Sequence, residues 1–247
     1  APTDFIQLIR RRLNWSNDDP IELIPHFTMR DLNSLAIQSR LVGMWANDIH
    51  NVLLISGDPP KMAPTYPRSS AVFDLDSKSV IYYVKNNLNR GIDFGGYKLG
   101  LQKNPQTKFT VGSGFEPEAL NMQRELEKLQ GKIDAGVDYI MTQPTFNKKV
   151  TDLLQSFRNR SSFLIGVMIL NGLEHAKRMA SVPGVVIPIE VFSKITRYDK
   201  IEDQKKVGAE IASEQIRWAQ AEGWAGIYLM SPASHEKIIQ TLDEGLS

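Results

Sequence analysis

Cysteine is missing from all 247 residues of the chain. Its absence excludes disulfides, zinc sites with thiolate ligands and a cysteine nucleophile within these residues, and it fits a reducing compartment. No apolar run approaches the roughly 18 residues that a membrane span needs. The first residues, Ala1-Pro2-Thr3-Asp4, do not resemble a signal peptide. We therefore expect a soluble, cytoplasmic protein with no membrane partner.

The chain also has little excess charge and few histidines. Lysine and arginine total 29 against 28 aspartates and glutamates, which gives no electrostatic reason to expect a nucleic-acid partner. His50, His175 and His235 have no neighbours at metal-ligand spacing, so we expect them at the surface and expect no metal site. Hydrophobic residues make up 42% and charged residues 23%, as in an ordinary globular protein.

What the sequence does contain is a regular alternation of strand and helix patterns. Short apolar runs predict seven strands, near residues 6, 24, 53, 110, 141, 166 and 228. Helical spacing predicts helices at 31–48, 77–89, 116–135, 150–158, 174–180, 200–222 and 234–244. Such alternation is typical of βα units on a parallel sheet. A closed (β/α)₈ TIM barrel needs eight strands. We therefore predict one α/β barrel domain over residues 1–247, incomplete at its N-terminus because the first strand is missing.

One predicted strand ends at a carboxylate. The run Asn51 to Ile55 is followed by Gly57-Asp58-Pro59-Pro60. Proline cannot continue a central strand, and glycine allows a close backbone approach to a ligand. Ligands of parallel α/β folds bind at the C-terminal ends of the strands. Asp58 is therefore a candidate site residue, with a simple turn-forming role as the alternative.

Several strand and helix ends resemble, in their order, those of the methylenetetrahydrofolate reductase family. They are Pro25-His26-Phe27-Thr28, Gly57-Asp58-Pro59-Pro60, Lys132-Ile133-Asp134-Ala135-Gly136 and Thr142-Gln143-Pro144. The Gly-Asp-Pro-Pro-Lys form and Val72-Phe73-Asp74 are most similar to the reductase half of proteins fused to homocysteine S-methyltransferase. The resemblance implies reduction of 5,10-methylenetetrahydrofolate to 5-methyltetrahydrofolate, a step of one-carbon metabolism and methionine biosynthesis. It implies FAD as cofactor, NADH or NADPH as hydride donor, and a homo-oligomer or an attached methyltransferase domain.

The resemblance also implies roles for individual residues. Asp58 would be the catalytic group that tunes the flavin and the folate, and Gln143 would hydrogen-bond the pterin. The positions implied for FAD binding are His26, Ser56, Gly57, Asp58, Gly112, Ser113, Glu116, Ala119, Glu125 and Lys132. Lys132 would lie near the diphosphate. From the residues alone, Lys132 could equally be a solvated helix lysine, Gln143 a loop amide, and His26 a general base or a core histidine.

Five departures from the family pattern concern the substrate end, and one is the last strand, which reads Tyr228-Leu229-Met230-Ser231-Pro232 instead of His-Phe-Tyr-Thr-Leu-Asn. The Glu-Phe-Phe-Pro-Pro motif, whose glutamate is the family's general acid, does not occur in the chain. Ser56 stands where an arginine often precedes Gly-Asp, and Leu173 replaces an aromatic residue. The run beginning at Gly166 lacks the usual proline. Two other interpretations therefore stay open: a non-catalytic barrel that binds flavin or folate as a partner subunit, and an enzyme acting on a phosphorylated small molecule.

Overall fold

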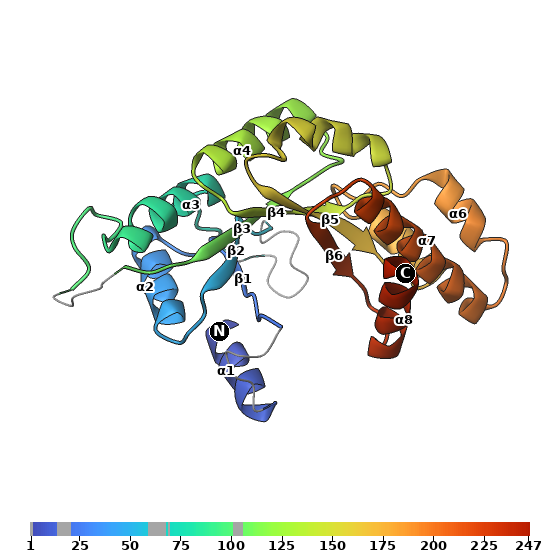
Figure 1. The fold of residues 1–247 in the computed structure, drawn as a ribbon, viewed down its shortest axis with the longest axis horizontal. Helices are drawn as coiled ribbons and strands as arrows, with labels where there is room; N and C mark the ends of the chain where they lie inside the picture. Colours follow the sequence, from blue (N-terminus) through green and yellow to red (C-terminus); the bar gives the residue numbers. More distant parts are fainter. Residues whose placement is uncertain (1, 14–20, 59–67, 69, 101–105) are drawn as a thin grey trace. The chain divides into compact units, whose positions relative to one another are not determined.

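The computed structural model describes residues 2–13, 21–58, 68, 70–100 and 106–247, and it is an α/β protein (Figure 1). The chain divides into two compact units, Ala1–Gly114 with Lys128–Asp138, and Phe115–Glu127 with Tyr139–Ser247. The described residues contain six strands, and the pairs β1–β2, β2–β3, β4–β5 and β5–β6 are all parallel. The predicted alternation on parallel strands is thus confirmed. Closure into an eight-stranded barrel stays a prediction.

The first unit is built on three strands that pair in chain order. Its elements are α1 (Pro2–Arg12), β1 (His26–Thr28), α2 (Ser34–Trp45), β2 (Asn51–Ile55), α3 (Ser77–Asn86), the 3₁₀ helix η2 (Leu88–Arg90) and most of β3 (Thr110–Phe115). The register places Leu53 of β2 opposite both His26 of β1 and Gly112 of β3. Val52, Leu53 and Leu54 are all buried, as expected for a central parallel strand that is covered on both faces.

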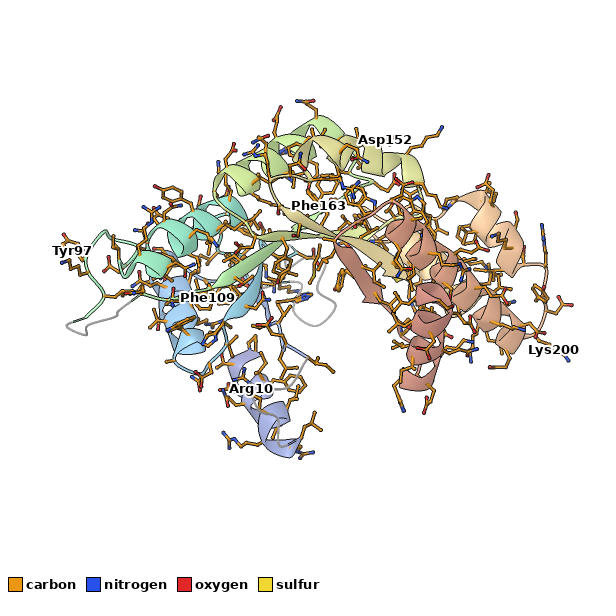
Figure 2. The ribbon with its side chains drawn as sticks, viewed as in Figure 1. Arg10, Tyr97, Phe109, Asp152, Phe163 and Lys200 are labelled. Carbon is orange, nitrogen blue, oxygen red and sulfur yellow. The ribbon has the colours of Figure 1, made fainter. Side chains whose placement is uncertain are left out.

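The N-terminal segment corrects the sequence prediction. The apolar run at residues 4–9 predicts a strand, but these residues lie inside the helix α1. A short apolar run fits either period, and here the tertiary contacts favour the helix. The Arg10 guanidinium, labelled in Figure 2, donates to the Asn47 and Asp48 carbonyls just after α2, while Ile6 is buried. The strand predicted around residue 24 is also shorter than expected, because only His26–Thr28 pair with β2.

The second unit contains the other three strands and most of the helical mass. Its elements are β4 (Tyr139–Pro144), the 3₁₀ helix η3 (Lys148–Phe157), β5 (Ser162–Met168), α5 (Leu173–Ala180), α6 (Ile189–Ile195), α7 (Ile201–Ala221), β6 (Gly226–Met230) and α8 (His235–Leu246). The helix α4 (Met122–Asp134) contributes residues to both units. The short helix α6 has no counterpart in the sequence prediction.

In the second unit, α7 packs closely against the segment that follows β5 and against α8. A Cβ added at Gly208 of α7 would lie 1.8 Å from the Leu170 carbonyl oxygen, so the glycine lets the two backbones touch. On its other side α7 lies beside α8 (Figure 1), where the Ser213 hydroxyl donates to the Thr241 carbonyl. Phe163 of β5, labelled in Figure 2, is buried at 1% exposure. No helix among the described residues is both long and apolar enough to cross a membrane.

Candidate active site

The turn after β2 presents Asp58 to solvent. Gly57 adopts φ +85°, in the left-handed region that favours glycine. A Cβ at Gly57 would also lie 3.2 Å from the Cβ atoms of Thr28 and Arg30, at the end of β1. Asp58 follows with an exposed side chain, and the Ser56 carbonyl accepts a hydrogen bond from the Arg30 amide at 3.0 Å. The end of β2 therefore has the geometry of a strand that stops at an accessible carboxylate.

Arg30 is a site residue that the sequence patterns did not indicate. Its Nη1 donates to the backbone carbonyl of Asp58, and its Nε donates to the Asp31 carboxylate at 2.7 Å. Asp31 itself has φ +69°, and its amide donates to the Val72 carbonyl. Arg30, which follows β1, thus holds the turn after β2 through hydrogen bonds to its backbone carbonyls. The only sequence signal was a charged residue two positions after a strand, which is too common to be informative.

His26 is the first residue of the neighbouring strand β1, so it lies at the start of that strand and not at its C-terminal end. It lies on the exposed face of β1, opposite Leu53. Surrounding atoms still desolvate the ring enough to lower the pKa of His26 below its ordinary value of 6.5. The imidazole is therefore neutral at pH 7, with one nitrogen that donates and one that accepts.

A buried lysine of α4 places its ammonium group at the C-terminal end of β3. Lys132 of α4 is 8% exposed, and its Nζ donates to the Gly114 carbonyl at 2.6 Å. This placement excludes the interpretation of Lys132 as a fully solvated helix lysine. Gly112 and Ser113 are buried in β3, and the Ser113 hydroxyl donates to the Leu54 carbonyl at 2.8 Å. Within this unit the structure thus gathers small residues and two cations, Lys132 and Arg30, at the ends of neighbouring strands.

The segment after β3 differs from the predicted helix. Residues 116–121 form a turn, and α4 begins only at Met122. Glu116 and Ala119 therefore lie in a turn, where the Ala119 amide donates to the Glu116 carbonyl at 3.2 Å. Glu125 is buried at 4% exposure, and its carboxylate accepts a hydrogen bond from the Glu116 amide at 3.3 Å. Proline at position 117 and the Asn121 side chain, which accepts from the Arg124 amide, explain the later helix start.

In the second unit, Gln143 is held at a local irregularity of the sheet. The register of β4 against β5 shifts between Met141 and Pro144. Gly166 makes this shift possible, since a Cβ there would lie 2.5 Å from the Thr142 and Gln143 carbonyl oxygens. The Thr142 hydroxyl also accepts a hydrogen bond from the Gly166 amide at 2.7 Å. The Gln143 side chain is exposed at the end of this bulged strand.

A cavity of about 430 Å³ lies close to the end of β4 in this unit. It is lined by Glu118, Phe146, Asn147, Lys148, Lys149, Val186 and Pro188. The Lys148 ammonium lies 5.6 Å from the Trp218 ring centroid, a cation–π distance. Thr145, next to the lining residue Phe146, accepts at its carbonyl a 2.7 Å hydrogen bond from the Gln215 amide of α7. The lining of the cavity combines apolar side chains with Lys148, Lys149 and the acidic Glu118.

His175 and Leu173 lie on α5, after the end of β5. The prediction that His175 is a surface residue is wrong, because the side chain is 8% exposed. Its Nδ1 accepts a hydrogen bond from the Asn171 amide at 3.0 Å. Burial, and then the charge of Arg178, hold the pKa of His175 below 6.5. This histidine therefore fixes the turn that leads from β5 into α5. No three histidine, aspartate or glutamate side chains in the described part of the chain form a cluster that could hold a metal ion.

Comparison with known families identifies the family to which the chain belongs. The family model described as methylenetetrahydrofolate reductase matches residues 12–244. The chain belongs to the methylenetetrahydrofolate reductase family. The resemblance predicted from the strand ends is thus confirmed, whereas the particular likeness to a fused reductase half stays a prediction.

The curated relatives have low sequence identity to this methylenetetrahydrofolate reductase family chain, and they are longer than it is. One is a probable methylenetetrahydrofolate reductase (NADH) of Oryza sativa subsp. japonica, 25% identical over 217 residues, which are 85% of this chain and 35% of that protein. Another is the 5,10-methylenetetrahydrofolate reductase of Escherichia coli (strain K12), 24% identical over 213 residues, with 82% of this chain and 63% of that protein covered. The chain therefore spans less than two thirds of either relative.

Proposed function

We propose that this chain acts as a flavin-dependent oxidoreductase that reduces 5,10-methylenetetrahydrofolate to 5-methyltetrahydrofolate with hydride from NADH or NADPH. The observation that carries the proposal is the turn at Gly57-Asp58, where a family member presents an exposed carboxylate at the C-terminal end of a parallel strand. The Oryza sativa and Escherichia coli relatives are named as methylenetetrahydrofolate reductases. NADH in the name of the Oryza sativa relative supports that donor.

The residues of the first unit suit an FAD. A flavin diphosphate needs cations and N–H donors, and Lys132 places its ammonium at the end of β3 while Arg30 places a guanidinium at the end of β2. Lys132 and His26 would bind the cofactor, and Gly57, Gly112 and Ser113 would let it approach the strands. FAD, when bound, would supply the chemistry of hydride acceptance and donation. The protein supplies binding, orientation and electrostatics.

Asp58 and Gln143 would act on the folate. The exposed Asp58 carboxylate would stabilise positive charge that develops on the one-carbon unit, which is electrostatic catalysis by a fixed negative group. Gln143 carries one acceptor and two donor hydrogens, a set that suits the edge of a pterin. The bulge at Gly166 would hold that amide in position. Glu116, Ala119 and Glu125 would serve the cofactor less directly, since Glu125 already bonds to the Glu116 amide.

A second candidate is a non-catalytic flavin- or folate-binding subunit. The observation that favours it is the absence of Glu-Phe-Phe-Pro-Pro, the motif that would carry the general acid, from the whole sequence. Leu173 in place of the family's aromatic residue also favours the non-catalytic subunit. For the enzyme, the proton that the folate nitrogen requires would have to come from water or from a residue outside these 247.

Absorbance spectroscopy separates the two candidates. The purified chain is reconstituted with FAD, reduced anaerobically by NADH or NADPH, and then mixed with 5,10-methylenetetrahydrofolate. The enzyme is expected to show a flavin spectrum that bleaches with the nicotinamide and returns with the folate. Flavin binding without reoxidation by the folate supports the binding subunit. A chain that binds no flavin contradicts the proposed oxidoreductase.

A further inference from the structure

A guanidinium bridges two strand ends in the first unit. Arg30 lies two residues after β1, and its Nη1 donates to the backbone carbonyl of Asp58, 28 positions further along the chain. Its Nε is engaged by the Asp31 carboxylate at 2.7 Å, which fixes the orientation of the planar group. The Arg30 side chain is 28% exposed, so the bridge is partly shielded from water. Two directed bonds from one rigid fork define a position more tightly than a single contact does.

The backbone around this bridge is also constrained. Gly57 and Asp31 both have positive φ, +85° and +69°, and only the first is a glycine. Aspartate tolerates the left-handed region better than most residues, and here its carboxylate is the partner of Arg30. The Arg30 amide adds a bond to the Ser56 carbonyl at 3.0 Å. Arg30 therefore contacts the residue before Gly57 and the residue after it.

We propose that Arg30 is a positioning residue for Asp58. By holding the Asp58 carbonyl, the guanidinium fixes the turn and so sets the direction in which the Asp58 carboxylate points. Because the guanidinium is paired with the Asp31 carboxylate at 2.7 Å, Arg30 acts on the turn through its directed hydrogen bonds and not through a net positive charge. This inference rests on the proposed role of Asp58 in folate reduction, but the bridge itself does not.

The first experiment measures position without activity. Amide NMR chemical shifts of Gly57 and Asp58 are compared in the Arg30→Ala, Arg30→Lys and Arg40→Ala variants. Arg40 is an exposed residue of α2 and serves as the matched loss of one arginine. Arg30→Ala should shift both amides strongly, Arg30→Lys should shift them less, and Arg40→Ala should leave them unchanged. Unchanged amides in a folded Arg30→Ala protein would overturn the positioning role whatever the enzyme does.

The second experiment asks whether Arg30 acts through Asp58. The rate at which 5,10-methylenetetrahydrofolate reoxidises the reduced flavin is measured in Arg30→Ala, Asp58→Asn and the double variant. We expect Arg30→Ala alone to lose about 10- to 100-fold, as misplacement of a catalytic group does. In the Asp58→Asn background the same change should cost little, because the charge it positions is gone. Full additivity of the two losses would overturn the inference. No flavin reoxidation in the unmutated chain would contradict the proposed function instead, and the NMR comparison would still decide on Arg30.

Discussion

Asp58 gives the sharpest prediction at the scale of single residues. Its backbone carbonyl is held by Arg30 and its carboxylate is exposed, so Asp58→Asn changes the charge without removing the bridge. We expect bound FAD to be retained and folate-dependent reoxidation of the flavin to slow by about 100-fold, the size of a lost electrostatic contact in a transition state. Stopped-flow absorbance measures the rate. Unchanged folate kinetics would contradict the role of Asp58.

Lys132 separates a structural role from a cofactor role. Its Nζ bonds to the Gly114 carbonyl, so Lys132→Met should destabilise the fold by about 1–3 kcal/mol through the unpaired carbonyl. If the ammonium also compensates the diphosphate, FAD affinity should fall by about tenfold or more. Lys128→Met, an exposed change on the same helix, is the control. Urea unfolding and equilibrium dialysis with FAD measure the two effects. Lower stability with full FAD affinity would leave Lys132 only its structural role.

At the scale of elements, strands with a distinct apolar run and a clear terminator were predictable, whereas the type of the N-terminal segment and the start of α4 were not. β2 and β5 combine such a run with clear terminators, and the structure places both near the predicted residues. The segment at residues 4–9 is too short for its period to separate strand from helix, and contacts of Arg10 and Ile6 decide for the helix. Long-range contacts are not visible in a local pattern.

The candidate site shows the same division. The places of Asp58 and Gln143 at strand ends were predictable because a strand followed by proline is a local signal, whereas their roles stay predictions. Arg30 was not, because its bond to Asp58 joins residues 28 positions apart. In the sequence Gly166 stands out only for the proline missing after it, whereas in the structure it admits the backbone of β4. Partners across a parallel sheet depend on register, which the sequence does not display.

Two glycines of the helices give a matched prediction on packing. Gly208 of α7 touches the Leu170 carbonyl, so Gly208→Ala should destabilise the protein by about 1–3 kcal/mol through overpacking. A Cβ added at Gly43 of α2 would meet no atom within 4 Å, so Gly43→Ala should stabilise by about 0.5–1 kcal/mol through helix propensity. Urea unfolding of both variants measures the difference. Equal effects would contradict the close contact between α7 and the segment after β5.

At the scale of the whole molecule, family membership and structure support different parts of the proposal. The family match covers residues 12–244 and therefore residues of both compact units. The structure adds the contacts that hold Asp58 and Lys132 in the first unit and Gln143 in the second. The missing general-acid motif concerns only the protonation of the folate. Flavin binding and nicotinamide oxidation can thus be tested separately from folate reduction.

Each unit also holds one histidine whose titration should govern stability near neutral pH. Burial lowers the pKa of His26, and burial together with Arg178 lowers the pKa of His175, both from 6.5. The unfolded chain takes up these protons at a higher pH than the folded chain, so stability should fall as the pH falls from 7.5 to 5.5. Above that range both histidines are neutral in the folded and the unfolded chain, so neither lowers the stability of the fold there. Burial raises the pKa of Asp76, but hydrogen bonds from Ser79 and the charges of Lys78 and Lys132 together lower it below 3.8, so Asp76 adds no slope in this window.

Urea midpoints at pH 7.5, 6.5 and 5.5 test this dependence. His175→Gln should flatten the slope, because an amide oxygen can still accept the Asn171 N–H bond but takes up no proton. The slope that remains in His175→Gln should be removed by a further change of His26. A midpoint that rises as the pH falls would contradict the lowered pKa of both histidines, since only groups with raised pKa values stabilise the folded state in acid.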